Sequence, residues 1–198
     1  MAEAGERQLI ERIKQGNKEA FKELVEKYKK PLYFYCYRLC RNQADAEDLS
    51  QEVFIKVYQK IIQFREESKI LTWIYRIAGN LFIDKSRKKV LTYTVNDSQD
   101  RDASFDTLAA HSETDELNPE KQVESVIIQK HIDAAMHKLS EKEKTAFILK
   151  HHNGLAIKEI AAIFNTSEST VKSHLFRAVK KLQTSLSFYK NELGLEES

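Results

Sequence analysis

The central stretch of the chain, residues 64–90, reads F-R-E-E-S-K-I-L-T-W-I-Y-R-I-A-G-N-L-F-I-D-K-S-R-K-K-V. A polar loop at its start leads into an amphipathic helix that ends in basic residues. At about 100° per residue, an apolar side and an adjoining polar stripe run along this helix. The apolar side consists of Ile74, Ile77, Ala78 and Leu81, and the stripe consists of Trp73, Arg76, Asn80 and Arg87. The pattern predicts one face for a core and another for a ligand or for solvent.

The polar stripe carries side chains suited to single-stranded nucleic acid. An indole can stack on a base, a guanidinium can hold a phosphate, and a carboxamide can read a base edge. A solvated helix face with ordinary charges fits the same residues. The stripe alone therefore leaves both interpretations open.

Composition predicts an all-α protein. The 198 residues leave room for one large domain or two small ones. A hydrophobic fraction of 41% supports real cores, while only five Gly and two Pro favour long helices over many short strands. No apolar run approaches the roughly 18 residues of a membrane span, and the start lacks the layout of a signal peptide. We therefore expect a cytoplasmic protein.

Charge is distributed unevenly along the chain, although the formal net charge is only +2. Residues 96–120 hold eight acids and one arginine, whereas residues 169–190 hold five lysines or arginines and no acid. Residues 96–117 show no sustained period, as in a flexible linker, and Asn118-Pro119-Glu120 then suits a helix start. We expect two small helical domains, 1–92 and 119–190, joined by an acidic linker, 93–118, and followed by a tail, 191–198.

An acidic block, D-A-E-D-L-S-Q-E-V-F at residues 45–54, precedes the central stretch. A helix here would bury Leu49, Val53 and Val57. Its outer side would present Asp45, Asp48, Gln51 and Glu52. Three interpretations remain: docking on a partner protein, a plain solvated face, and metal catalysis. The last has least support because no histidine or second carboxylate set stands at a metal-binding spacing.

The C-terminal third has the layout of a helix-turn-helix. Ser140 and Glu143 match a capping box, and residues 155–182 then form two helices separated by Asn165-Thr166-Ser167. The outward side of the second helix would carry Ser169, Lys172, Ser173, Phe176, Arg177 and Lys180. Its cations can bind phosphate or guanine, and an exposed Phe can meet a thymine methyl. A basic helix packed on another protein is the alternative.

Two cysteines, Cys36 and Cys40, lie four residues apart on an expected helix. They could bind a soft metal or sense redox state, but no further ligand stands nearby, so small buried apolar groups are the favoured interpretation. His151-His152 is likewise too sparse for a metal site. We expect no metal, no cofactor and no catalytic residue.

These motifs together resemble the extracytoplasmic-function (ECF) sigma factors of bacterial RNA polymerase. Three blocks carry the resemblance in the same order: the acidic block, then T-W-I-Y-R-I-A-G-N-L-F-I-D-K-S-R, then the helix-turn-helix ending T-V-K-S-H-L-F-R-A-V-K-K-L. The resemblance covers nearly the whole chain. It implies a promoter-specific initiation factor, not an enzyme, that binds core polymerase and promoter DNA and that is held inactive by an anti-sigma factor.

The resemblance also assigns residues to partners. The β′ clamp helices of the polymerase would meet Asp45, Asp48, Gln51 and Glu52, and the second domain would meet the β flap. Opening and capture of the -10 element would use Phe64, Arg65, Trp73, Arg76, Asn80, Lys85, Arg87 and Lys88. The -35 duplex would be read by Ser169, Lys172, Ser173, Phe176, Arg177 and Lys180.

Two rival functions come from other classes. A stand-alone helix-turn-helix regulator would bind duplex DNA without polymerase. The acidic docking face gives this interpretation little support. A metal-dependent nuclease would need a ligand constellation that the sequence does not offer.

Overall fold

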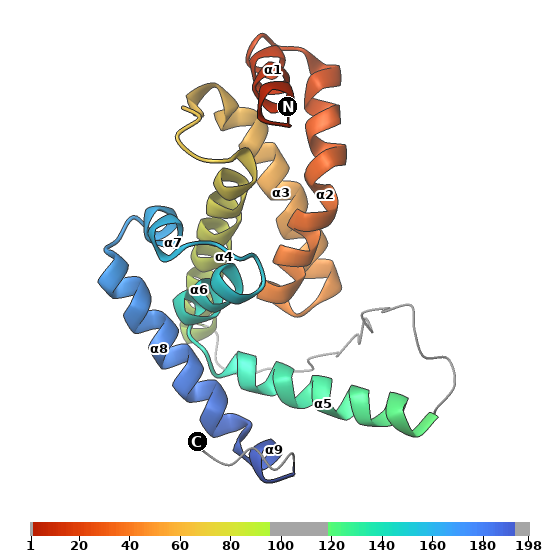
Figure 1. Ribbon diagram of the computed structural model, residues 1–198, viewed down its shortest axis with the longest axis vertical. Helices are drawn as coiled ribbons and strands as arrows, with labels where there is room; N and C mark the ends of the chain where they lie inside the picture. The colour runs from red at the N-terminus through yellow and green to blue at the C-terminus, as the bar shows by residue number, and fades with distance from the viewer. Residues whose placement is uncertain (1, 96–118, 193–198) are drawn as a thin grey trace. The chain divides into compact units, whose positions relative to one another are not determined.

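The computed structural model describes residues 2–95 and 119–192 (Figure 1). The expected linker and tail fall largely outside these residues. The described residues form helices and loops without a strand, so the predicted all-α class is confirmed. The chain divides into two compact units, one formed mainly by residues 2–95 and the other mainly by residues 119–192. Among the described helices, none is long and apolar enough to cross a membrane.

The first unit is a bundle around the long second helix. Its elements are α1 (Ala2–Lys14), α2 (Lys18–Cys40), α3 (Gln43–Lys60), the 3-10 helix η1 (Ile61–Gln63) and α4 (Ile70–Val95). Helix α2 packs on α1, α3 and α4, and α3 also packs on α4 (Figure 1). Gly16 takes the left-handed conformation (φ +85°) between the first two helices, and the Asn17 side chain caps α2 by accepting from Ala20 N. Glycine and asparagine are the residues that most readily end one helix and start the next.

Helix α2 continues through Pro31, although a proline inside a helix tends to break or kink it. Proline removes one backbone hydrogen bond and crowds the preceding turn. Burial on both sides of the proline offsets that cost, because Leu24 and Tyr28 before it and Leu32 and Tyr35 after it all lie in the core. The helix therefore runs unbroken from Lys18 to Cys40.

Both cysteines lie on α2 and form no disulfide. Cys36 is buried and Cys40 is half-buried. Burial, together with the neighbouring Cys40, raises the pKa of the Cys36 thiol. A thiol with a raised pKa is a weak nucleophile and metal ligand, in keeping with the interpretation of Cys36 as a small core residue.

The second unit contains the helix-turn-helix. Its elements are α5 (Pro119–His137), α6 (Glu141–His151), α7 (Ile157–Phe164), α8 (Glu168–Ser185) and α9 (Ser187–Glu192). Helix α8 packs on α6 and also on α5 and α9. Ser140 and Glu143 form the predicted capping box. Ser167 caps α8 by accepting from Thr170 N, after Asn165 turns the chain at φ +50°. These helix starts confirm the predicted helix-turn-helix.

Candidate nucleic-acid interface

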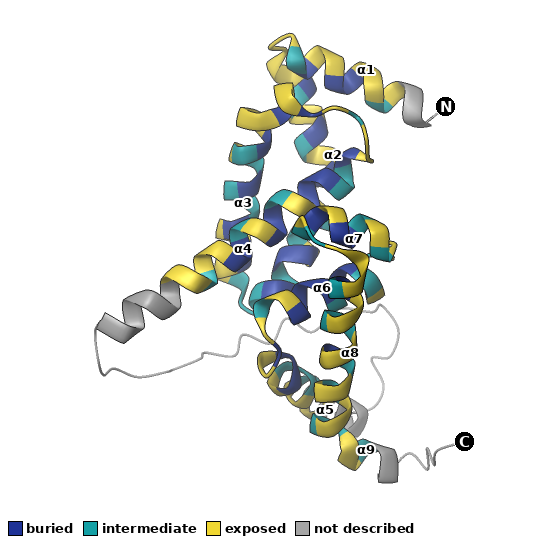
Figure 2. Ribbon diagram, turned by 90° about the vertical axis from the view of Figure 1, so that its left-hand side faces the viewer, coloured by how far each residue is buried: buried dark blue, intermediate teal, exposed yellow. Residues whose placement is uncertain are grey.

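The polar stripe of α4 is solvent-exposed over most of its length. Arg76, Asn80 and Arg87 are exposed, as the periodicity predicted. Lys85 and Lys88 are also exposed, and Figure 2 colours much of this part of α4 yellow. Arg65, in the loop before α4, is exposed too. Six of the eight residues expected at the -10 element are therefore accessible to a ligand.

The other two expected contacts, Phe64 and Trp73, are buried, and the prediction of an exposed indole is wrong. Their side chains are only 5% and 6% exposed, and their ring centroids lie 5.2 Å apart at an interplanar angle of 49°. Helical periodicity put Trp73 at the edge of the polar stripe. It could not predict that the loop would bring Phe64 back onto the indole.

The loop between η1 and α4 is fixed by apolar and charged contacts. Ile70, at the start of α4, is 1% exposed. Glu66 adopts φ +58°, and its carboxylate lies 3.4 Å from Arg7 Nε and 3.8 Å from Lys14 Nζ of α1. These contacts hold the loop against α1, while the Arg65 side chain stays exposed.

Asp84 interrupts the positive charge of the α4 stripe. It is exposed and lies one turn after Asn80, so the two side chains share a helix face. A carboxylate there repels phosphate, which favours contacts to bases over contacts to the backbone near Asn80. The predicted stripe included only side chains that attract nucleic acid, so it left out Asp84 although periodicity places this residue on the same face.

The outer side of α3 presents the expected acidic residues. Asp45, Asp48 and Gln51 are exposed, and Glu52 is half-buried. Glu52 Oε2 lies 2.6 Å from Lys85 Nζ of α4. One residue expected to meet polymerase is thus paired with one expected to meet DNA. In the described part of the chain, no group of three or more His, Cys, Asp or Glu is placed to hold a metal ion.

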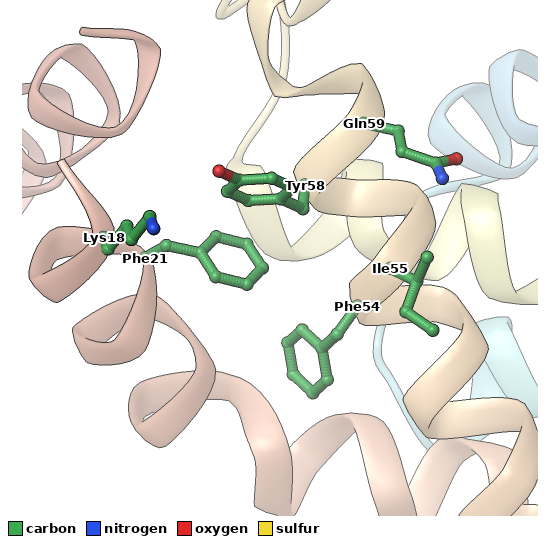
Figure 3. Close-up of a pocket in the computed structure, with 6 residues that line it drawn as sticks. All are labelled: Lys18, Phe21, Phe54, Ile55, Tyr58 and Gln59. Atoms are coloured by element: carbon green, nitrogen blue, oxygen red, sulfur yellow. The ribbon is translucent and has the colours of Figure 1, made fainter. Parts of the chain in front are cut away.

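An apolar groove continues along α3 beyond the acidic residues. Figure 3 shows Phe21 of α2 facing Tyr58 of α3, with ring centroids 4.8 Å apart. The groove has a volume of about 460 Å³ and is also lined by Lys18, Phe54, Ile55 and Gln59. Ile55 is 57% exposed and lies one turn after Gln51. The lining residues come from both α2 and α3, so no local sequence pattern predicts this groove.

Helix α8 exposes all six residues that were expected to face duplex DNA: Ser169, Lys172, Ser173, Phe176, Arg177 and Lys180. Phe176 is 69% exposed, a large apolar area for one side chain in water. Two of these polar side chains also donate hydrogen bonds to backbone carbonyls of α8. Ser173 Oγ donates to the Ser169 carbonyl at 3.0 Å, and Arg177 Nε donates to the Ser173 carbonyl at 3.2 Å.

A buried carboxylate lies behind this face. Glu143 Oε2 accepts from Lys181 Nζ at 2.7 Å and from the Ser140 amide at 2.9 Å, while its Oε1 lies 3.7 Å from Arg177 Nε. Burial by itself raises the pKa of Glu143, but the hydrogen bonds from Lys181 and Ser140 outweigh burial and lower the pKa below its ordinary value. The carboxylate is therefore charged at neutral pH. The capping-box pattern in the sequence identified Glu143 as a helix-capping residue. Its contact with Lys181 joins residues that are 38 positions apart in the sequence, so no local pattern could predict it.

Comparison with known proteins gives matches over both units. The family model for sigma-70 region 2 matches residues 24–92, and the model for sigma-70 region 4 matches residues 130–182. The ECF RNA polymerase sigma factor SigW of Bacillus subtilis is 36% identical over 89% of this chain and 94% of its own length. The ECF RNA polymerase sigma-E factor of Haemophilus influenzae is 34% identical over 90% and 93%.

Two solved structures share the fold. The sigma factor RpoE of Bartonella quintana, in complex with the anti-sigma factor NepR, superposes with a TM-score of 0.65 at 24% identity and covers 84% of this chain and 96% of its own. CnrH, in complex with the cytosolic domain of CnrY, gives a TM-score of 0.62 at 19% identity over 91% and 96%.

A basic, exposed helix in one unit and a helix-turn-helix in the other are characteristic of a DNA-binding protein of the all-α class. The sequence relatives narrow the class further, and the chain belongs to the ECF family of RNA polymerase sigma factors. The predicted family is confirmed. Sigma factors act in transcription initiation and bind core RNA polymerase and promoter DNA.

Proposed function

We propose that this sigma factor binds polymerase through α3, captures the opened -10 element along α4 and reads the -35 duplex with α8. The observation that carries the proposal is the exposure of all six outward residues on α8. An apolar ring such as Phe176, exposed among lysines and an arginine, is suited to a thymine methyl within a phosphate-binding surface. Polymerase binding supplies the holding energy that a single short recognition helix lacks.

The polymerase contact is assigned to Asp45, Asp48, Gln51 and Glu52. Asp45, Asp48 and Gln51 are exposed and Glu52 is half-buried on one side of α3, which supports docking on a basic helical surface that we identify with the β′ clamp helices. The second unit would contact the β flap. Charge complementarity of this kind speeds encounter and fixes register.

The -10 contact is assigned to Arg65, Arg76, Asn80, Arg87 and the nearby lysines Lys85 and Lys88. Phe64 and Trp73 take a supporting role, because the contact between their buried rings holds the loop against the start of α4. Capture of an unstacked base offsets part of the cost of unpairing, since a base can stack on the guanidinium plane of an arginine and its edge can bond to the Asn80 amide. Strand opening then requires no hydrolysis by this chain.

Regulation by an anti-sigma factor is part of the proposal. Of the two fold neighbours, RpoE was solved with the anti-sigma factor NepR bound, and CnrH with the cytosolic domain of CnrY bound. A protein that works on polymerase in this way acts in the cytoplasm, and any membrane link would come through the anti-sigma factor. A stand-alone DNA-binding regulator is not favoured, because the family match extends over the polymerase-binding region as well.

Reconstitution with core RNA polymerase tests the proposal. The chain is mixed with core enzyme, and the complex selects promoters from a DNA library randomised at both elements. We expect co-elution with core enzyme, selection of a defined -35 and -10 pair, and run-off transcription from the selected promoter. Tight, sequence-specific binding to duplex DNA by the chain alone, without co-elution, would instead support the stand-alone regulator.

A further inference from the structure

Glu143 joins the start of α6 to the middle of the recognition helix. Its carboxylate completes the capping box with Ser140 and also contacts two cations on α8. Lys181 donates to Oε2 at 2.7 Å, and Arg177 Nε lies 3.7 Å from Oε1. The Glu143 side chain is only 5% exposed, whereas those of Arg177 and Lys181 are 56% and 44% exposed. A shielded anion therefore faces two cations that reach into solvent.

The spacing of the two cations suits one shared anion. Arg177 and Lys181 are four residues apart, so they lie on the same side of α8 one turn from each other. Because Glu143 is shielded from water, its attraction for both is weakened less by solvent and salt than that of a surface pair. The contact restricts the long side chain of Arg177 before any DNA arrives.

Arg177 is held by three groups of the second unit. Its Nε donates to the Ser173 carbonyl at 3.2 Å and faces the Glu143 carboxylate, while Nη2 lies 3.3 Å from His174 Nδ1. Of these, Glu143 alone comes from another helix. It therefore ties the orientation of the guanidinium to the body of the domain, whereas the other two contacts would move with α8.

We propose that Glu143 is a positioning residue for -35 recognition, which holds Arg177 in the conformation that reads DNA. This inference rests on the proposed role of α8 in the -35 contact. Preorganisation lowers the ordering cost that a flexible arginine would incur on binding. The gain is specific to the base that Arg177 contacts, whereas removal of an anion near DNA strengthens attraction to any phosphate backbone. Discrimination between sequences is thus the informative quantity.

The test compares holoenzymes that carry wild-type chain or Glu143→Gln. Glutamine also completes a capping box, so this variant keeps the acceptor for the Ser140 amide but loses the charge that holds Arg177. Binding is measured to a promoter selected by the wild-type holoenzyme and to versions with one changed -35 base pair. We expect discrimination at one or two adjacent positions to fall about 5- to 10-fold, at the lower end of the range that one base contact supplies, with scrambled DNA bound equally well or better.

A double-mutant cycle with Arg177→Ala separates positioning from a general effect on the fold. If Glu143 acts through Arg177, Glu143→Gln changes discrimination in the wild-type background and changes nothing further beside Arg177→Ala. Glu141→Gln is the matched control, because it neutralises a carboxylate in the same turn of α6 that pairs with Lys144 of its own helix. It should leave discrimination unchanged.

Each of the following results would contradict the inference. Unchanged discrimination in Glu143→Gln, with a loss in Arg177→Ala, rejects positioning by Glu143 and leaves the -35 role of α8 standing. If Arg177→Ala leaves discrimination unchanged, both the positioning role of Glu143 and the -35 role of α8 are rejected. Equal losses from Glu143→Gln in the two backgrounds, or a similar loss in Glu141→Gln, assign the effect to folding of the second unit, which thermal unfolding of the same proteins would show directly.

Discussion

Glu52 and Lys85 form an ion pair between α3 and α4, with Glu52 Oε2 2.6 Å from Lys85 Nζ. The two side chains are 36% and 48% exposed, so solvent screens the pair, and it contributes at most about 1 kcal/mol to folding. The pair matters for function because of where its two side chains lie. The carboxylate belongs to the proposed polymerase contact and the ammonium to the proposed DNA contact, so binding of either partner competes with the pair.

The first prediction concerns this pair. Glu52→Gln should leave thermal stability nearly unchanged but weaken binding to core polymerase a few-fold, because an exposed pair contributes little to folding while an interface charge guides docking. Binding is measured by fluorescence anisotropy of labelled chain titrated with core enzyme. The exchanged variant, Glu52→Lys with Lys85→Glu, restores an ion pair with reversed charges. It should fold normally and initiate poorly, and wild-type transcription by this variant would contradict both residue assignments.

The second prediction concerns the contact between the buried rings of Phe64 and Trp73. Replacement of a buried aromatic by alanine leaves a cavity, so Trp73→Ala should lower the free energy of unfolding of the first unit by about 3–5 kcal/mol. Trp73→Phe keeps a ring against Phe64 and should cost clearly less. Urea denaturation followed by circular dichroism measures both. If Trp73→Ala lost strand opening at wild-type stability, the indole would be acting as a base contact.

Local sequence patterns predicted the helices well because each signal involves neighbouring residues. Gly16 and Asn17 define one helix boundary, Ser140 with Glu143 another, and Ser167 the start of the recognition helix. In each case a side chain satisfies a backbone group within three residues. The exposed face of α8 followed from periodicity once that start was known.

Contacts between distant residues account for what the sequence did not predict. Phe64 returns onto Trp73 through a loop, Glu143 reaches Lys181 on another helix, and Glu52 pairs with Lys85. Periodicity gives the direction of a side chain on its own helix, but it contains no information on which neighbour covers that side chain. The buried indole and the shared carboxylate therefore required the packed structure.

The third prediction separates opening from docking. Asn80 is exposed on the α4 stripe, so Asn80→Ala should not change stability. It should weaken open-complex formation by roughly 1 kcal/mol, the usual worth of a hydrogen bond, while core-polymerase affinity stays constant. Permanganate reactivity of unpaired thymines measures opening. Asp84→Asn is the companion variant one turn away and should improve DNA binding by removing a repulsive charge. An equal loss of opening and polymerase affinity in Asn80→Ala would contradict its role in base capture.

The fourth prediction concerns pH and His174. Burial, together with Arg177 and Lys142, lowers the pKa of His174 below its ordinary value, so the folded unit disfavours the protonated ring. A histidine whose pKa is lower in the folded than in the unfolded state binds fewer protons when folded, and stability then falls as pH drops through the unfolded pKa, about 6.5. The neutral ring can accept from Arg177 Nη2, 3.3 Å from Nδ1, and a protonated ring would repel it. Thermal unfolding from pH 7.5 to 5.5 should therefore show a loss of stability that is smaller in His174→Gln, accompanied in the wild type by weaker -35 discrimination at the acid end. Parallel curves for the two proteins would show that the pKa of His174 is the same in the folded and unfolded states, and the loss of discrimination would then have to arise elsewhere on the recognition helix.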